Sequence, residues 1–86
     1  MPEISRFFGI SIKMYFGDHE PPHFHTEYGE HKAVVDIHTL VVIGGYLPPR
    51  VLGLVVEWAS QHQVELLALW KRAINQQPLH KIPPLS

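Results

Sequence analysis

The hydrophobic pattern of the chain changes near its middle from the period of a strand to the period of a helix. In residues 10–16, apolar side chains at every second position alternate with other residues, as in a β-strand that buries one face. The same alternation returns in residues 23–28 and 31–37, and a shorter apolar run covers residues 41–45. We therefore expect an antiparallel meander of three strands, with a fourth that its two glycines weaken.

The turn between the second and third of these strands sets their register. Gly29 and Glu30 separate the two alternating runs, and glycine at the first central position favours a type II′ hairpin turn. The expected pairs are Tyr28 with His31, Glu27 with Lys32, Thr26 with Ala33, His25 with Val34, Phe24 with Val35, and His23 with Asp36. This register gives one apolar face and brings opposite charges together on the other, so both faces support it.

The first strand is expected to pair with the second so that both faces match again. The favoured pairs are Phe16 with Phe24 and Met14 with Thr26 on the apolar face, and Tyr15 with His25 and Lys13 with Glu27 on the polar face. All three strands then present their apolar residues to one core.

Helical spacing begins after Pro48 and Pro49, which suit the first turn of a helix. We predict helices over residues 49–60 and 61–76, the second opening on a sequence that resembles a capping box, and an irregular tail over residues 77–86. Their apolar stripes should pack on the sheet through Val55, Trp58, Leu66, Leu67 and Trp70. The fold class that follows is α+β in one domain of residues 1–86, with both helices on one face of the meander.

Composition narrows the class of protein. The chain has 86 residues, no cysteine and a formal net charge of −1, which excludes disulfides, thiolate metal sites and a long-range field that attracts nucleic acid. The first residues lack the pattern of a signal peptide, and no apolar run is long enough to cross a bilayer. We expect a cytoplasmic protein without a membrane partner, to which nucleic acid would bind only through a local cluster.

Four of the seven histidines fall between residues 19 and 31. Strand geometry places His23 and His25 on the same face, with Asp36 opposite His23 and Tyr15 beside His25. Two imidazoles, a carboxylate and a phenol would then share one small patch of the sheet.

Three interpretations of this patch remain open. As a metal site, His23, His25 and Asp36 would supply ligands of the types that zinc takes, completed by His19 or His31. As an acid–base site, Asp36 would orient His23 while His25 serves as the second acid or base, an arrangement able to cleave RNA without a metal. As ordinary surface, the same residues would form the polar face of a hairpin.

Four further residues are candidates for binding. Tyr15, His19 and Glu27 border the patch, and Arg50 follows the paired prolines at a helix start, where an anion can bind. None of the four belongs to a specific motif.

Several segments of the chain resemble the bacterial family known as domain of unknown function 4160. The segments are "MPEISRFFGI", "PPHFH", "EYGE", "YLPPRVLGLVVEWAS" and "LHKIPPL", and residues 21–25 are the most specific. Members of this family tend to be encoded beside other small uncharacterised domains, an arrangement often interpreted as that of a toxin–antitoxin-like pair. The resemblance implies a small bacterial interaction module that pairs with the product of a neighbouring gene. It assigns no reaction, and the alternative is a small histidine-dependent nuclease or metal-binding enzyme that uses the patch.

Two more expectations concern the third turn and association. The family usually has a glycine after the position of Thr39, where this chain has Leu40, so the chain departs from the family pattern in the turn before the fourth strand. An edge strand pairs readily with another chain, and the tail offers Leu79, Ile82 and Leu85 to a neighbour. We therefore expect a homo-oligomer or a complex with a cognate partner.

Overall fold

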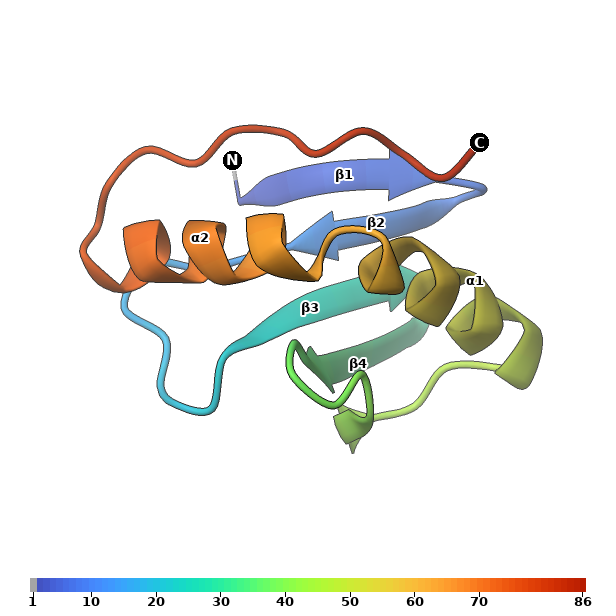
Figure 1. Cartoon of the computed structure of the whole chain (residues 1–86). Helices are drawn as coiled ribbons and strands as arrows, with labels where there is room; N and C mark the ends of the chain where they lie inside the picture. The colour runs from blue at the N-terminus through green and yellow to red at the C-terminus, as the bar shows by residue number, and fades with distance from the viewer. Residues whose placement is uncertain (1) are drawn as a thin grey trace.

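The computed structural model describes residues 2–86 as one antiparallel sheet followed by two helices (Figure 1). The elements are β1 (Glu3–Phe7), β2 (Ile10–Lys13), β3 (His23–Tyr28), β4 (His31–Asp36), β5 (Val42–Gly45), α1 (Pro49–Ser60) and α2 (Gln63–Ile74). Each strand lies beside the next one in sequence. The α+β class is confirmed, but the sheet has five strands instead of three to four.

The additional strand is β1, which a two-residue turn at Phe8 and Gly9 connects to β2. Both turn residues have positive φ, 50° and 77°, as a type I′ hairpin turn requires. The apolar pattern of β1 is irregular, because Ile4 and Ser5 are both buried next to a shift in register between Glu3 and Ser5. The sequence of β1 therefore lacks the strict alternation that indicates a strand.

The hairpin of β3 and β4 has the register that the sequence predicts, from Tyr28 opposite His31 to His23 opposite Asp36. Gly29 has a φ of 57° in the connecting turn, which suits the first central position of a type II′ turn.

The pairing predicted between β2 and β3 is wrong by two residues. Lys13 lies opposite His25 and Ser11 lies opposite Glu27. A shift of two keeps every side chain on its predicted face, but it shortens the strand. β2 ends at Lys13, and Phe16, which was expected in the core, is exposed.

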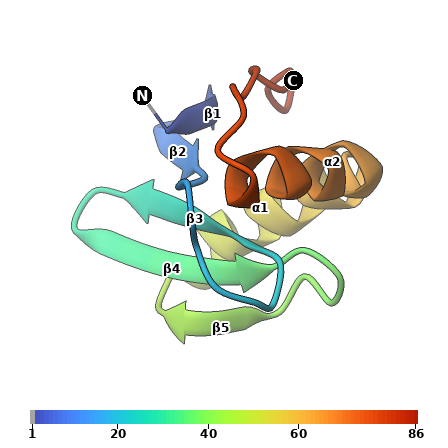
Figure 2. The same ribbon diagram turned by 90° about the vertical axis from the view of Figure 1, so that its left-hand side faces the viewer.

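Both helices pack on one face of the sheet, and no helix of the described chain covers the other face (Figure 2). The core lies between these layers and is centred on Trp58, which is fully buried. The Trp58 ring contacts Phe7 and Phe24, at centroid distances of 5.4 and 5.9 Å. Val55, Leu66 and Trp70 are buried as expected, whereas Leu67 is only partly buried and Leu69 is buried in its place.

The predicted capping box before α2 is absent. Ser60 Oγ donates to the backbone carbonyl of Glu57, and His62 occupies the N-cap position without a side-chain capping hydrogen bond. The Gln63 amide instead donates to the carbonyl oxygens of Ile37 and His38, at 2.9 and 3.2 Å. It thereby fixes the start of α2 to the turn that follows β4.

The tail after α2 packs on its own chain instead of lying free for a neighbour. Ile82 is buried, and its N–H donates to the carbonyl of Ile4 in β1 at 2.7 Å. The Trp58 indole donates to the carbonyl of Pro83 at 2.9 Å. The tail thus runs along β1, as Figure 1 shows, and covers that edge of the sheet. In the described chain, no helix is long and apolar enough to span a membrane.

Candidate functional site

Asp18 lies between two imidazole rings at one end of β3. Its Oδ2 atom is 2.9 Å from Nε2 of His23 and 2.9 Å from Nε2 of His25. The three atoms all lie within 4.8 Å of one another, and the ring centroids are 5.2 Å apart. We call these three residues the Asp–His–His cluster.

Strand β3 and the loop before it position the cluster, and α2 holds both in place. The two histidines are two positions apart on β3 and so share a face. The His23 ring lies 5.0 Å from the indole of Trp70 in α2 and is buried. In the loop that carries Asp18, the N–H of Gly17 donates to the carbonyl of Ala73, near the end of α2, at 3.2 Å.

A backbone carbonyl determines which nitrogen of His23 faces the aspartate. Nδ1 of His23 is 2.7 Å from the carbonyl oxygen of Pro21. A carbonyl oxygen only accepts, so Nδ1 carries a proton, and in a neutral ring Nε2 is then an acceptor. It faces Asp18 Oδ2, another acceptor. This contact is favourable when Nε2 is also protonated, or when a metal ion binds both atoms.

The carboxyl group of Asp18 favours its charged form. Partial burial raises the pKa of Asp18, but the hydrogen bonds from His25 and His23, together with their positive charges, lower that pKa by more. The net shift is below the ordinary value, so the carboxylate is ionised at neutral pH. The cluster therefore offers one anionic oxygen and two imidazole nitrogens.

Asp36 does not take the position that the sequence analysis gave it. Its Cα lies opposite that of His23, as predicted, but its Oδ1 accepts from the backbone N–H groups of His38 and Thr39, at 2.7 and 3.0 Å. Asp36 therefore caps the turn after β4. The prediction that it orients His23 is wrong, because Asp18 is the carboxylate that contacts both rings.

Asp18 was missed because its place beside Gly17 and before two prolines is typical of a turn residue. The signal that could have found it is the reversal of the chain at Pro21 and Pro22. Asp18 lies five residues before His23. Because the chain reverses direction between them, the side chain of Asp18 lies close to the start of the strand.

Of the predicted binding residues, Tyr15 and Glu27 lie close to the cluster. The Tyr15 ring packs edge-on against His25, with centroids 4.7 Å apart. Glu27 accepts from Lys13 Nζ at 3.1 Å on the same face. Both contacts survive the change of register because diagonal neighbours on a sheet remain within reach of long side chains.

The other predicted residues lie outside the cluster. His19 is exposed in the loop beside Asp18, and Arg50 is exposed in the first turn of α1. His31 begins β4, where its ring lies 5.7 Å from that of Tyr46. Neither His19 nor His31 belongs to the group of possible metal ligands that the Asp–His–His cluster forms.

A comparison with protein-family models agrees with the resemblance noted in the sequence. Residues 9–71 match the model described as "Domain of unknown function (DUF4160)". The chain belongs to the DUF4160 family. The matched residues include the whole Asp–His–His cluster, whereas β1 and the tail lie outside them. No curated protein and no solved structure matches this DUF4160 chain.

The turn after β4 shows how the chain accommodates Leu40, where the sequence resemblance leads us to expect a glycine. Leu40 has a φ of 59°, in the left-handed region that favours glycine. Its side chain is partly buried and packs against the hydrophobic core. The turn therefore keeps the backbone conformation that suits glycine, although the residue is a leucine.

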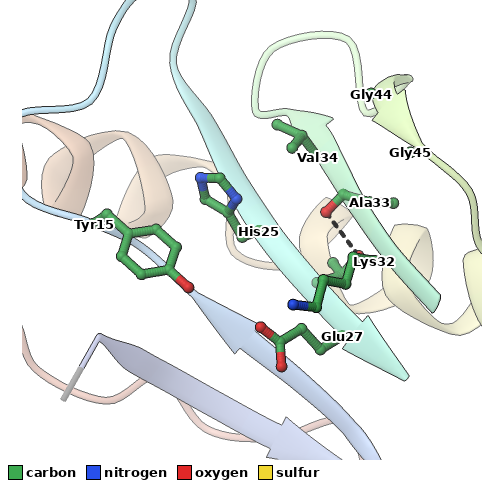
Figure 3. Close-up of a pocket in the computed structure, with 9 residues that line it drawn as sticks. Tyr15, His25, Glu27, Lys32, Ala33, Val34, Gly44 and Gly45 are labelled. Carbon is green, nitrogen blue, oxygen red and sulfur yellow. Dashed lines mark hydrogen bonds between the residues drawn. The ribbon is translucent and has the colours of Figure 1, made fainter. Parts of the chain in front are cut away.

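The open face of the sheet is hollowed beside His25 (Figure 3). The hollow has a volume of about 290 Å³, and the side chains around it come from Tyr15, His25, Glu27, Lys32 and Val34. On the β5 side, Gly44 and Gly45 line it without side chains. In this DUF4160 chain, His25 thus belongs both to the cluster and to the wall of the hollow.

Proposed function

We propose that Asp18, His23 and His25 bind a divalent transition-metal ion, and that the protein is a metal-binding domain with a catalytic type of site. The observation that carries the proposal is the convergence of two Nε2 atoms on one carboxylate oxygen, 2.9 Å from each. Imidazole nitrogen and carboxylate oxygen are the ligands of catalytic zinc and of other divalent first-row metals.

The surroundings of His23 support this proposal. Histidines that bind a metal through one nitrogen usually donate the other N–H to a carbonyl or a carboxylate, which fixes the tautomer. His23 has this arrangement, because Nδ1 is 2.7 Å from the carbonyl oxygen of Pro21. The lone pair of Nε2 is then directed at the point where the carboxylate of Asp18 also lies.

The dimensions of the cluster also suit an ion. With metal–ligand bonds of about 2.0–2.2 Å, tetrahedral ligand atoms lie roughly 3.4 Å apart. The three candidate atoms are within 4.8 Å of one another, so small side-chain rotations suffice. Three protein ligands leave a coordination position open, as in sites that activate water, whereas structural zinc sites have four ligands.

Zinc titration with single substitutions tests the proposal. We expect one zinc ion per chain by calorimetry, with NMR shifts in both rings of the cluster. Loss of a residue that only orients a metal ligand lowers metal affinity about 10–100-fold. Asp18→Asn and His25→Gln remove ligands themselves, so each should lower zinc affinity more than about 100-fold.

Asp36→Asn and His31→Gln are the matched controls, since they change a carboxylate and a histidine outside the cluster. Both should bind zinc like the wild type. Zinc affinity that is unchanged by Asp18→Asn and His25→Gln, or no zinc binding at all, would refute the metal site. In the latter case Asp18 is a hydrogen-bond partner of both rings, and the acid–base nuclease becomes the function to assay.

A second candidate function is the interaction module that the family resemblance suggests, with a partner strand added to β5. The supporting observation is the contrast between the two edges of the sheet. The tail covers β1, whereas Val41, Ile43 and Tyr46 beside or within β5 are each about half exposed or more. No charged residue occurs between Asp36 and Arg50 to discourage such pairing.

A further inference from the structure

The hollow beside His25 combines a free cation with a carboxylate. Among residues 2–86, Lys32 forms no ion pair, whereas Lys13 is held by Glu27 at 3.1 Å. The Lys32 ammonium group is therefore available to an anion. Glu27 accepts one hydrogen bond from Lys13, and its remaining lone pairs can accept from hydroxyl or amino groups of a ligand.

An aromatic ring forms one side of the same hollow, and glycine backbone forms the opposite side. The Tyr15 ring is held edge-on by His25, which fixes its orientation, and 38% of the residue is exposed. Such a ring provides a stacking surface for a planar group. Opposite, Gly44 presents no side chain (Figure 3), so a ligand can approach the backbone of β5.

Size and overall charge limit the ligand. A volume of about 290 Å³ is at the lower end of the range of small-molecule sites, about 300–1,000 Å³. The formal net charge of the chain is −1, which gives no general attraction for a long polyanion. A small anion with a planar ring and hydroxyl groups fits these limits better than a nucleic acid strand does.

We propose that this hollow binds a mononucleotide, with its phosphate at Lys32, its ribose hydroxyls at Glu27 and its base against Tyr15. Because His25 forms a wall of the hollow, the nucleotide would lie next to the metal ion. Any reaction of the bound nucleotide rests on the proposed metal site. The contacts that bind the nucleotide belong to the sheet and do not require the metal.

Substitution of Gly44 provides the sharpest test. A Cβ atom at residue 44 would meet only Val34 Cβ and Cγ2, both at 3.8 Å, which is an ordinary contact. Its φ is not positive, and valine is favoured in strands. Gly44→Val should therefore fold at least as well as the wild type while its side chain fills the hollow.

The probe is adenosine 5′-monophosphate, titrated into zinc-loaded and zinc-free protein and followed by NMR. Gly44→Val should weaken binding of this nucleotide at least about tenfold without changing zinc affinity. Lys32→Ala should weaken it about tenfold, the effect expected for one charged hydrogen bond, and should leave binding of adenosine unchanged. Lys71→Ala, which removes an exposed lysine of α2, is the control and should have no effect.

Each outcome separates the two proposals. Zinc binding without nucleotide binding would refute the nucleotide site in the hollow and leave the proposed metal site intact. Nucleotide binding that is insensitive to Gly44→Val and Lys32→Ala would have the same meaning. If the protein does not bind zinc but binds the nucleotide in a way that both substitutions weaken, the result supports the nucleotide site in the hollow and refutes the metal site. A short single-stranded oligonucleotide that binds at least tenfold more tightly than the mononucleotide overturns the choice of ligand.

Discussion

The carbonyl oxygen of Pro21 determines the chemistry of the candidate site as much as the histidines do. It accepts a hydrogen bond from Nδ1 of His23, with the nitrogen and the oxygen 2.7 Å apart, and so presents Nε2 to Asp18. A histidine with a free Nδ1 could change tautomer and donate to the carboxylate while remaining neutral. His23 has no such freedom, so the site needs either a bound proton or a bound cation. This is why the zinc titration is decisive for the function.

Two adjacent glycines of β5 should respond in opposite ways to the same change. A Cβ atom at Gly45 would lie 2.9 Å from Ala33 Cα and would overlap the carbonyl oxygen of Lys32, and its φ of 75° is unfavourable for alanine. Gly44 has neither obstacle. We expect Gly45→Ala to lower the free energy of unfolding by more than about 2 kcal/mol, and Gly44→Ala to change it by less than about 0.5 kcal/mol.

Urea denaturation of the two variants measures this difference. Equal stability of the two alanine variants would mean that the backbone of β5 relaxes around the new side chain. The hollow would then be more adaptable than its geometry indicates.

At the scale of elements, the sequence was most informative where two patterns agreed. The β3–β4 register follows from alternation on both faces and from the turn at Gly29, and the structure has it. The β2–β3 register had no turn to fix it, because a loop of nine residues, 14–22, joins these strands. A shift of two preserves both faces, so alternation alone could not distinguish the two registers.

The candidate site was only partly predictable for a similar reason. The placement of His23 and His25 on one face follows from the period of a strand. The position of Asp18 depends on how the loop folds back and on its bond to α2. Neither is a local property of the sequence, so the strand pattern suggested Asp36 instead.

In the hairpin of β1 and β2, Glu3 should make the stability of the fold depend on pH in the acid range. The hydrogen bond from Ser11, at 2.6 Å, is the largest cause that lowers the pKa of Glu3 to about 2 from its ordinary value of 4.5, followed by the hydrogen bond from Arg6. A carboxyl group whose pKa is lower in the folded state stabilises the fold above its unfolded pKa. That stabilisation should be lost progressively as the pH falls from about 4.5 to about 2.

Denaturation of Glu3→Gln between pH 2 and pH 7 checks this prediction. The variant should be less stable than the wild type at pH 7, and the difference should shrink toward pH 2. Glu57→Gln, which changes an exposed carboxylate on α1, should not show this pH-dependent difference. A constant difference between Glu3→Gln and the wild type over the whole range would assign the effect to packing instead of charge.

At the scale of the molecule, the two sheet edges are treated differently. The tail, which the sequence analysis assigned to a neighbouring molecule, closes the β1 edge through Ile82. Its irregular, proline-rich sequence has no period, so only the packed structure reveals where it lies. The β5 edge has exposed apolar residues at Val41, Ile43 and Tyr46, and any strand added to the protein should add there.

Association through β5 can be tested with two substitutions of the same kind. Ile43 is 49% exposed in β5, and Val64 is 84% exposed on α2. If a second strand pairs with β5, Ile43→Lys should abolish self-association in sedimentation velocity runs, or binding to the product of a neighbouring gene, because a charged side chain opposes strand addition at an edge. Val64→Lys, which places the same charge on a more exposed apolar residue, should leave association unchanged. A wild-type chain that stays monomeric at high concentration and does not bind that partner would contradict the interaction module, as would association that survives Ile43→Lys.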